Sequence, residues 1–167
     1  FRDIRNELTV PVVYNCNGAH TKELFEIILN ISDIFLFDVK YADNAPSIEF
    51  SNIKEYVKHN TECLDMLLER SIPWVENDLG ILQKGLIIRH LVLPGYVGNS
   101  VSVIEKLRKY KDNGLNFKLS LMSQYFPAYK AHDHLSINRK LTTEEYSQVT
   151  SLVEKYDIDG WIQDLEE

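Results

Sequence analysis

The amino-acid sequence predicts an α/β protein built on a parallel sheet, and two observations support this prediction. Strand-like and helix-like segments alternate along the chain, which favours parallel strands joined by right-handed crossover helices. The run Gly85–Gly95 (GLIIRHLVLPG) has six large aliphatic residues before Pro94, a pattern typical of a strand buried on both faces. Five such strands would form either an open sheet or part of a barrel.

The expected elements alternate strictly from the first strand to the last. The strands are expected at Val10–Tyr14, Ile34–Lys40, Gly85–Gly95, Phe117–Met122 and Gly160–Gln163. The helices are expected from Thr21 to Ile31, from Lys54 to Glu69, from near Ser102 to Lys111, and from Thr142 to Tyr156. Tyr41–Ile53 is expected to be a loop, and Ile72–Gln83 an excursion that precedes the third strand.

Local sequence signals mark the ends of several of these helices. Thr21 is a candidate N-cap. Ser102 with Glu105, and Thr142 with Glu145, have the spacing of capping boxes. Asn113-Gly114 has the composition of a helix C-terminus.

Composition limits the classes of function. The 167 residues, 44% of them hydrophobic, suit one domain with a substantial core. A formal net charge of −7 without a basic block argues against nucleic-acid binding. No apolar run has the length of a membrane span, and the start lacks a signal-peptide core, so we expect no membrane association. Only Cys16 and Cys63 are present, which favours a reduced, cytoplasmic setting.

Polar residues at strand ends are the candidate ligand-binding groups, because α/β proteins bind ligands at the carboxyl ends of their strands. Asp38 and Lys40 share a face and would offer an acceptor and a cation to a zwitterionic ligand. Asn15 and Asn17 also share a face, and Gly18 permits a tight turn. Asparagines at strand ends are often turn formers, and Asp38 with Lys40 could also form a weak surface ion pair.

The long aliphatic run adds Arg89, whose charge requires a partner or a ligand. We expect Arg89 to face the ligand and the adjacent His90 to be a satisfied core histidine. Gln124 follows the fourth strand and is a further candidate. The nearby His132-Asp133-His134 is weak evidence for a metal site and is expected to lie in a surface loop. Cys16 lies on the face opposite Asn15 and is expected to be a core residue.

Taken in chain order, five motifs resemble radical S-adenosylmethionine proteins, specifically the group related to pyruvate formate-lyase activating enzymes. They are Tyr14–Gly18 (YNCNG), Phe35–Tyr41 (FLFDVKY), Gly85–Gly95, Leu121–Tyr125 (LMSQY) and Ile137–Arg139 (INR). The resemblance runs from about Leu8 to the C-terminus. It implies a partial (β/α)₆ barrel of which residues 1–167 would be the C-terminal part.

The resemblance also implies cofactors and a parent activity. S-adenosylmethionine would bind a [4Fe–4S] cluster held by a Cys-x₃-Cys-x₂-Cys loop, and its reductive cleavage would lead to hydrogen abstraction. The product could be a glycyl radical on a partner protein. The cofactor-binding residues carried over from the resemblance are Asn15, Asn17, Gly18, Asp38, Lys40, Arg89 and Gln124.

The chain also departs from the family's pattern. It has no Cys-x₃-Cys-x₂-Cys loop and no Gly-Gly-Glu-like motif, and its two cysteines lie too far apart in sequence to supply three thiolates. Asn15 stands where the activating enzymes carry an aspartate. Because the chain also begins at Phe1 without a methionine, we expect it to be a C-terminal fragment that does not itself cleave S-adenosylmethionine.

Two other interpretations remain open at this point. One is a non-catalytic α/β binding or interaction module that has lost the cluster. The other is an unrelated small-molecule enzyme that uses Asp38, Lys40 and Arg89 without iron. In the fragment interpretation, the strand Val10–Tyr14 lacks a neighbour, so we expect self-association or a covering N-terminal segment at that edge.

Overall fold

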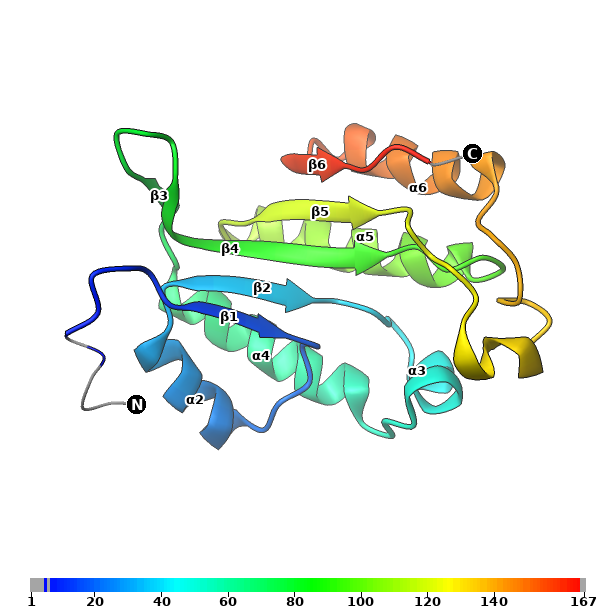
Figure 1. Ribbon diagram of the computed structural model, residues 1–167, viewed down its shortest axis with the longest axis horizontal. Coiled ribbons are helices and arrows are strands. Elements are labelled where there is room, and N and C mark those ends of the chain that lie inside the picture. Colours follow the sequence, from blue (N-terminus) through cyan, green and yellow to red (C-terminus); the bar gives the residue numbers. More distant parts are fainter. Residues whose placement is uncertain (1–4, 6, 166–167) are drawn as a thin grey trace.

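The computed structural model describes residue 5 and residues 7–165 (Figure 1). Residues 1–4, with which the sequence opens, lie outside the described part. The helices are α2 (Lys22–Ile31), α3 (Asn44–Ser51), α4 (Tyr56–Arg70), α5 (Val97–Asp112), the 3₁₀ helix η1 (Tyr129–Asp133) and α6 (Thr143–Lys155). The strands are β1 (Val13–Cys16), β2 (Ile34–Asp38), β3 (Val75–Glu76), β4 (Leu82–Leu91), β5 (Lys118–Met122) and β6 (Gly160–Ile162).

The predicted parallel α/β architecture is confirmed. Five strands lie in the order β1-β2-β4-β5-β6, and each neighbouring pair is parallel. The short strand β3 pairs antiparallel with the start of β4. The register aligns Asp38 with Arg89, and Arg89 with Ser120, so polar residues of three strands meet near the carboxyl end of the sheet.

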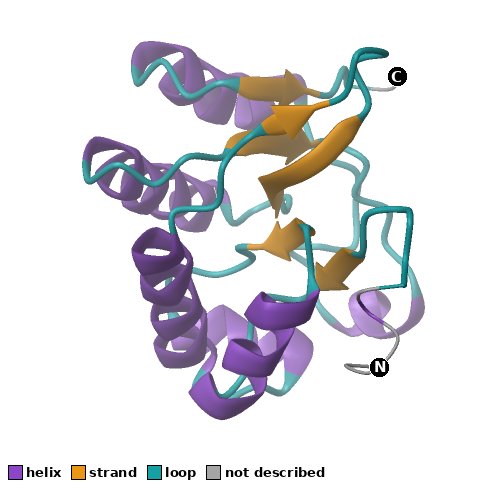
Figure 2. Cartoon of the chain, turned by 90° about the vertical axis from the view of Figure 1, so that its left-hand side faces the viewer, coloured by secondary structure: helices purple, strands orange, loops and turns teal. Residues whose placement is uncertain are grey.

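The long helices lie along one face of the sheet and leave the other face uncovered (Figure 2). On the covered face, Phe35, Phe37, Ile88, Leu119 and Leu121 are almost or fully inaccessible to solvent and form the core. On the other face most side chains are only partly buried. This open face carries Leu36, Asp38, Ile87, Arg89, Leu91, Ser120 and Met122. The expectation that the Gly85–Gly95 strand is buried on both faces is therefore wrong for its second face.

One predicted loop contains a helix. Within Tyr41–Ile53, helix α3 begins after Asp43, whose side chain accepts a hydrogen bond from the Ala45 amide at 2.6 Å. Pro46 lies in the first turn of α3, where a backbone N–H has no partner inside the helix. Turn-forming residues can thus start a helix as well as interrupt one.

Several boundaries also differ from the predictions. Strand β1 is shifted toward Cys16, because the Val12 amide donates to the Asp33 carboxylate at 2.8 Å instead of entering the sheet. Strand β4 begins at Leu82, where its pairing with β3 extends it beyond the predicted start. Helix α5 begins at Val97, so the predicted capping box of Ser102 lies inside the helix and is wrong.

Other helix ends are confirmed. The Thr21 side chain accepts from the Leu24 amide, and Thr142 with Glu145 forms a reciprocal capping box. Gly114, just past α5, has φ +95° as a C-terminal glycine should. Among the described residues, no helix is long and apolar enough to cross a bilayer.

Candidate functional site

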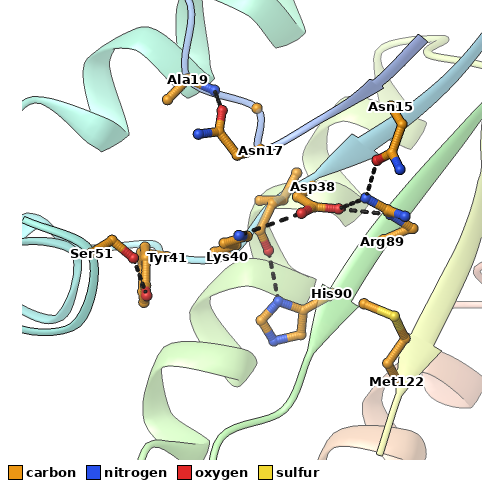
Figure 3. Close-up of polar contacts among 12 residues, drawn as sticks. Asn15, Asn17, Ala19, Asp38, Lys40, Tyr41, Ser51, Arg89, His90 and Met122 are labelled. Atoms are coloured by element: carbon orange, nitrogen blue, oxygen red, sulfur yellow. Dashed lines mark hydrogen bonds and ion pairs between the residues drawn. The ribbon is translucent and has the colours of Figure 1, made fainter. Parts of the chain in front are cut away.

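Four of the predicted residues come together at the carboxyl end of the open face (Figure 3). The Arg89 side chain donates from Nε to Oδ1 of Asp38 at 2.7 Å and from a terminal nitrogen to Oδ1 of Asn15 at 2.6 Å. Lys40 places its ammonium 3.6 Å from the other carboxylate oxygen of Asp38. We call Asn15, Asp38, Lys40 and Arg89 the ion cluster.

Asp38, Lys40 and Arg89 of the ion cluster border a cavity of about 230 Å³, which we call the cluster cavity. Its lining also includes Tyr41, Leu91, Leu93 and Met122. Asp38 is mostly buried, with 13% of its side chain exposed, whereas 42% of the Lys40 side chain is exposed. Two cations and one carboxylate leave the lining with an excess positive charge, which suits a ligand carboxylate or another anionic group.

Helix α4 holds the strand ends that carry the cluster. The hydroxyl of the fully buried Tyr56 accepts from the Lys40 amide at 2.8 Å and lies 3.2 Å from the carbonyl oxygens of Asn17 and Asp38. One turn later, Nδ2 of the buried Asn60 donates to the carbonyls of Gly18 and Asp38. These contacts fasten the β1–α2 turn to the end of β2.

Only a weak signal in the sequence indicates this support. Asn60 occupies a position on the apolar stripe of α4, where a buried amide needs partners. Its Oδ1 accepts from Lys106 of α5 at 3.2 Å, and Lys106 also donates to Thr61. Burial lowers the pKa of Lys106 to about 8, partly offset by the negative charge of Asp65. The buried polar residue on a helical stripe was the available clue, but its partners lie far away in sequence.

Gly18 has the predicted tight-turn role, and its reason is steric. It has φ +74°, and a Cβ added there would lie 2.0 Å from the Asp38 carbonyl oxygen. The neighbouring Asn17 does not join the ion cluster, because its side chain accepts from the Ala19 amide at 3.1 Å. Asn17 thus behaves as a turn former, whereas Asn15 contacts Arg89.

Gln124 lies apart from the ion cluster. Its side chain contacts Gln163 at 3.3 Å and borders a different hollow, beside Trp161. Met122 separates the two places, since it lines both this hollow and the cluster cavity. Of the seven predicted cofactor-binding residues, the structure therefore assembles Asn15, Asp38, Lys40 and Arg89 into one cluster, with Gly18 supporting it.

His90 is a satisfied core histidine, as predicted. It is fully buried, and its Nδ1 lies 2.7 Å from the Val39 carbonyl oxygen, so Nδ1 must donate. Its Nε2 lies 2.8 Å from the Ser100 hydroxyl and accepts from it. Burial lowers the pKa of His90 to about 4, which keeps the ring neutral at pH 7. Val39 lies between Asp38 and Lys40, so His90 helps to fix the cluster from the covered side.

The described cysteines do not suit an iron–sulfur cluster. Cys16 and Cys63 are both buried, and desolvation raises the pKa of each thiol to about 11, which disfavours the thiolate that a cluster needs. Within the described residues, no three His, Cys, Asp or Glu side chains are grouped to hold a metal ion. His132 and His134 have separate partners, Asn138 and Glu49.

Comparison with known proteins gives a partial match. No protein-family model matches the chain. Over 151 residues the chain is 32% identical to an uncharacterized protein of Methanocaldococcus jannaschii. The alignment covers 90% of this chain but 40% of the archaeal protein, so the chain spans less than half the length of that relative.

Proposed function

We propose that this chain forms the S-adenosylmethionine-binding part of a radical enzyme related to the pyruvate formate-lyase activating enzymes. The observation that carries the proposal is the ion cluster, in which Asp38, Lys40 and Arg89 border one cavity at the carboxyl ends of parallel strands. A mixed set of cations and a carboxylate suits the zwitterionic methionine end of the cofactor. The one-sided helical layer, with its open face, is what part of a (β/α)₆ barrel would present (Figure 2).

The size of the cluster cavity supports binding of one portion of the cofactor. At about 230 Å³ the cavity is smaller than the roughly 300–1,000 Å³ usual for a complete small-molecule site. The rest of the ligand would extend along the open face. Strand β1 ends the sheet on one side and its Val13 is 52% exposed, so in this proposal another segment or a second copy covers that edge.

The described residues do not provide the cluster chemistry of such an enzyme. Cys16 and Cys63, the two cysteines of this sequence, are buried thiols, so the thiolates for a [4Fe–4S] cluster would have to come from outside these 167 residues. The same observation favours a second candidate, a non-catalytic module that binds a zwitterionic ligand in the cluster cavity.

Calorimetric titration of the chain with S-adenosylmethionine tests the binding claim. We expect Lys40→Met to weaken binding about tenfold, because one charge-assisted contact to the ligand is lost. Lys58→Met is the matched control, since Lys58 is an exposed lysine of α4 that pairs with Glu55. Equal affinity of wild type and Lys40→Met, or no binding at all, would contradict the proposal.

A second experiment separates the two candidate functions. The complete open reading frame that encodes the chain is reconstituted anaerobically with iron and sulfide, and 5′-deoxyadenosine is measured after reduction in the presence of S-adenosylmethionine. Formation of 5′-deoxyadenosine supports the radical enzyme. A reconstituted protein that binds S-adenosylmethionine without cleaving it supports the binding module.

A further inference from the structure

A second cavity adjoins the cluster cavity and has a different chemical character. It measures about 330 Å³ and shares Tyr41 and Leu93 with the cluster cavity. Its walls include Phe50 of α3, Tyr125 after β5, and Tyr129 and His134 near η1. We call this cavity the aromatic recess. Its volume alone falls within the range of small-molecule sites.

Three rings of the aromatic recess, those of Tyr41, Phe50 and Tyr125, are held by contacts within the protein. The Tyr41 hydroxyl lies 2.8 Å from the Ser51 hydroxyl, and the Tyr125 hydroxyl donates to the Ile137 carbonyl at 2.9 Å. Phe50 makes an edge-to-face contact with the His134 ring, with ring centroids 5.2 Å apart. Because their hydroxyls are engaged, Tyr41 and Tyr125 offer mainly ring carbons to an occupant, which favours an aromatic group.

His134 offers a polar ring nitrogen to a ligand in the recess. Nδ1 of His134 lies 3.0 Å from Oε1 of Glu49 and donates to it, while the Tyr96 hydroxyl donates to the other oxygen of that carboxylate. When Nδ1 carries the only ring hydrogen, Nε2 is an acceptor, and Nε2 has no hydrogen-bond partner among the described residues. The recess thus combines aromatic walls with an oriented acceptor.

We propose that the aromatic recess binds the part of the substrate that carries an aromatic ring with a hydrogen-bond donor, such as a phenol. The walls accept the ring, and Nε2 of His134 accepts the hydrogen of the donor. The recess adjoins the cluster cavity through Tyr41 and Leu93. Identifying its occupant as part of the substrate therefore rests on the proposed function. The binding of an aromatic donor can be tested independently.

Two probes that differ by one methyl group on the ring oxygen test the inference. p-Cresol carries the hydroxyl donor, whereas 4-methylanisole has the same ring with the donor blocked. Titrations followed by methyl NMR would report on Leu93, Ala131 and Ile137, which line the recess. We expect p-cresol to bind about fivefold more tightly, the effect of one net hydrogen bond.

A matched pair of variants assigns the donor preference to one side chain. His134→Phe keeps a ring in contact with Phe50 but removes the acceptor, and it should abolish the preference for p-cresol. His132→Phe is the control, because His132 is an exposed histidine of the same segment that pairs with Asn138. It should leave the preference unchanged.

The possible outcomes keep the two proposals distinguishable. Equal binding of both probes by wild type, no shift of the recess methyls, or a preference that persists in His134→Phe would overturn the inference. Binding of S-adenosylmethionine without p-cresol binding would leave the proposed function standing and remove the recess from it. Selective p-cresol binding without S-adenosylmethionine binding would support the recess as an aromatic-donor site and contradict the proposed function.

Discussion

Both ends of the open face carry positively charged side chains, but the surroundings of these side chains differ. At the carboxyl end, Arg89 and Lys40 share one carboxylate beside the cluster cavity. At the amino end, Lys118 lies over the rings of Trp74 and Trp161, at 4.8 and 5.7 Å from their centroids, and its ammonium is 3.4 Å from the Asp159 carboxylate. The cation at the amino end lies against aromatic rings of its own protein, whereas those at the carboxyl end border a cavity that a ligand can enter.

Packing explains part of this difference. Trp74 lies directly against Gly85, where an added Cβ would be 3.0 Å from its ring, so the indole covers the start of β4. At the other end, the supporting contacts come from α4 on the covered side and leave the open side free. In barrel-like α/β proteins the carboxyl end of the strands commonly carries function and the amino end stability, and the site proposed for this chain lies at the carboxyl end.

The largest effect is expected from Gly18→Ala, which tests the geometry of the carboxyl end. The new methyl group would overlap the Asp38 carbonyl oxygen, so we expect a loss of about 4 kcal/mol or more in the free energy of unfolding. Gly80→Ala is the matched control, because Gly80 has a similar φ of +72° with no atom within 4 Å of the added Cβ. Gly80→Ala should lower the free energy of unfolding, measured by urea denaturation, by about 1 kcal/mol. Equal losses for the two variants would show that the close approach at Gly18 is unimportant.

Acid should weaken the carboxyl end through His90. Its folded-state pKa of about 4 lies below the unfolded value of 6.5, so the unfolded chain binds the proton more readily. The contribution of neutral His90 to the free energy of unfolding is fully present above pH 6.5 and falls as the pH drops toward 4. The whole pKa difference corresponds to a loss of roughly 3 kcal/mol.

A comparison of two variants isolates the contribution of His90 to this pH dependence. The free energy of unfolding is measured by denaturation at several pH values between 7 and 4. It should depend less steeply on pH for His90→Gln than for wild type, because the titrating ring is absent. His132→Gln, which changes an exposed histidine, should leave the slope as it is in wild type. An unchanged slope in His90→Gln would contradict the burial argument.

Breaking the ion cluster should have an intermediate effect. Arg89→Met leaves Asp38 with Lys40 at 3.6 Å as its remaining charged neighbour, so we expect about 1–3 kcal/mol of destabilisation. Binding of S-adenosylmethionine should weaken as well. Arg108→Met removes an exposed arginine that pairs with Asp112 within α5, and it should change the free energy of unfolding by less than about 1 kcal/mol. A similarly small effect for Arg89→Met would show that the cluster does not hold the strand ends.

The smallest effect is expected at the amino end. Lys118→Met keeps most of the side-chain length but removes the charge between the two indole rings, so about 0.5–1 kcal/mol of stability should be lost. Affinity for S-adenosylmethionine should stay within about twofold of wild type, because Lys118 is at the other end of the open face. A larger loss of affinity would erase the functional distinction between the ends.

The sequence predicted what depends on local pattern and missed what depends on distant contacts. The apolar strands and the capping residues Thr21 and Thr142 follow from short-range periodicity and hydrogen bonding, so they were found. Asp38 and Arg89 were expected at one site because parallel strands bring their carboxyl ends together.

The features that the sequence did not predict can also be explained in physical terms. Tyr56 and Asn60 read as ordinary positions of an amphipathic helix, since the carbonyls that they bind belong to other elements. Helix α3 was missed because Asp43, Asn44 and Pro46 have turn-forming preferences that also suit a helix start. The sequence did not indicate that Gln124 lies apart from the ion cluster, because strand ends that share an edge can still face different hollows.

In the proposed function, the carboxyl end of the open face binds a ligand through the carboxylate of that ligand. The most direct measurement is chemical-shift mapping of the chain with S-adenosylmethionine and with its decarboxylated analogue. We predict that S-adenosylmethionine shifts the resonances of Asp38, Lys40 and Arg89, leaves those of Trp74 and Trp161 unchanged, and binds at least tenfold more tightly than the analogue. Equal affinities for the two ligands, or shifts centred on Trp74 and Trp161, would contradict the account.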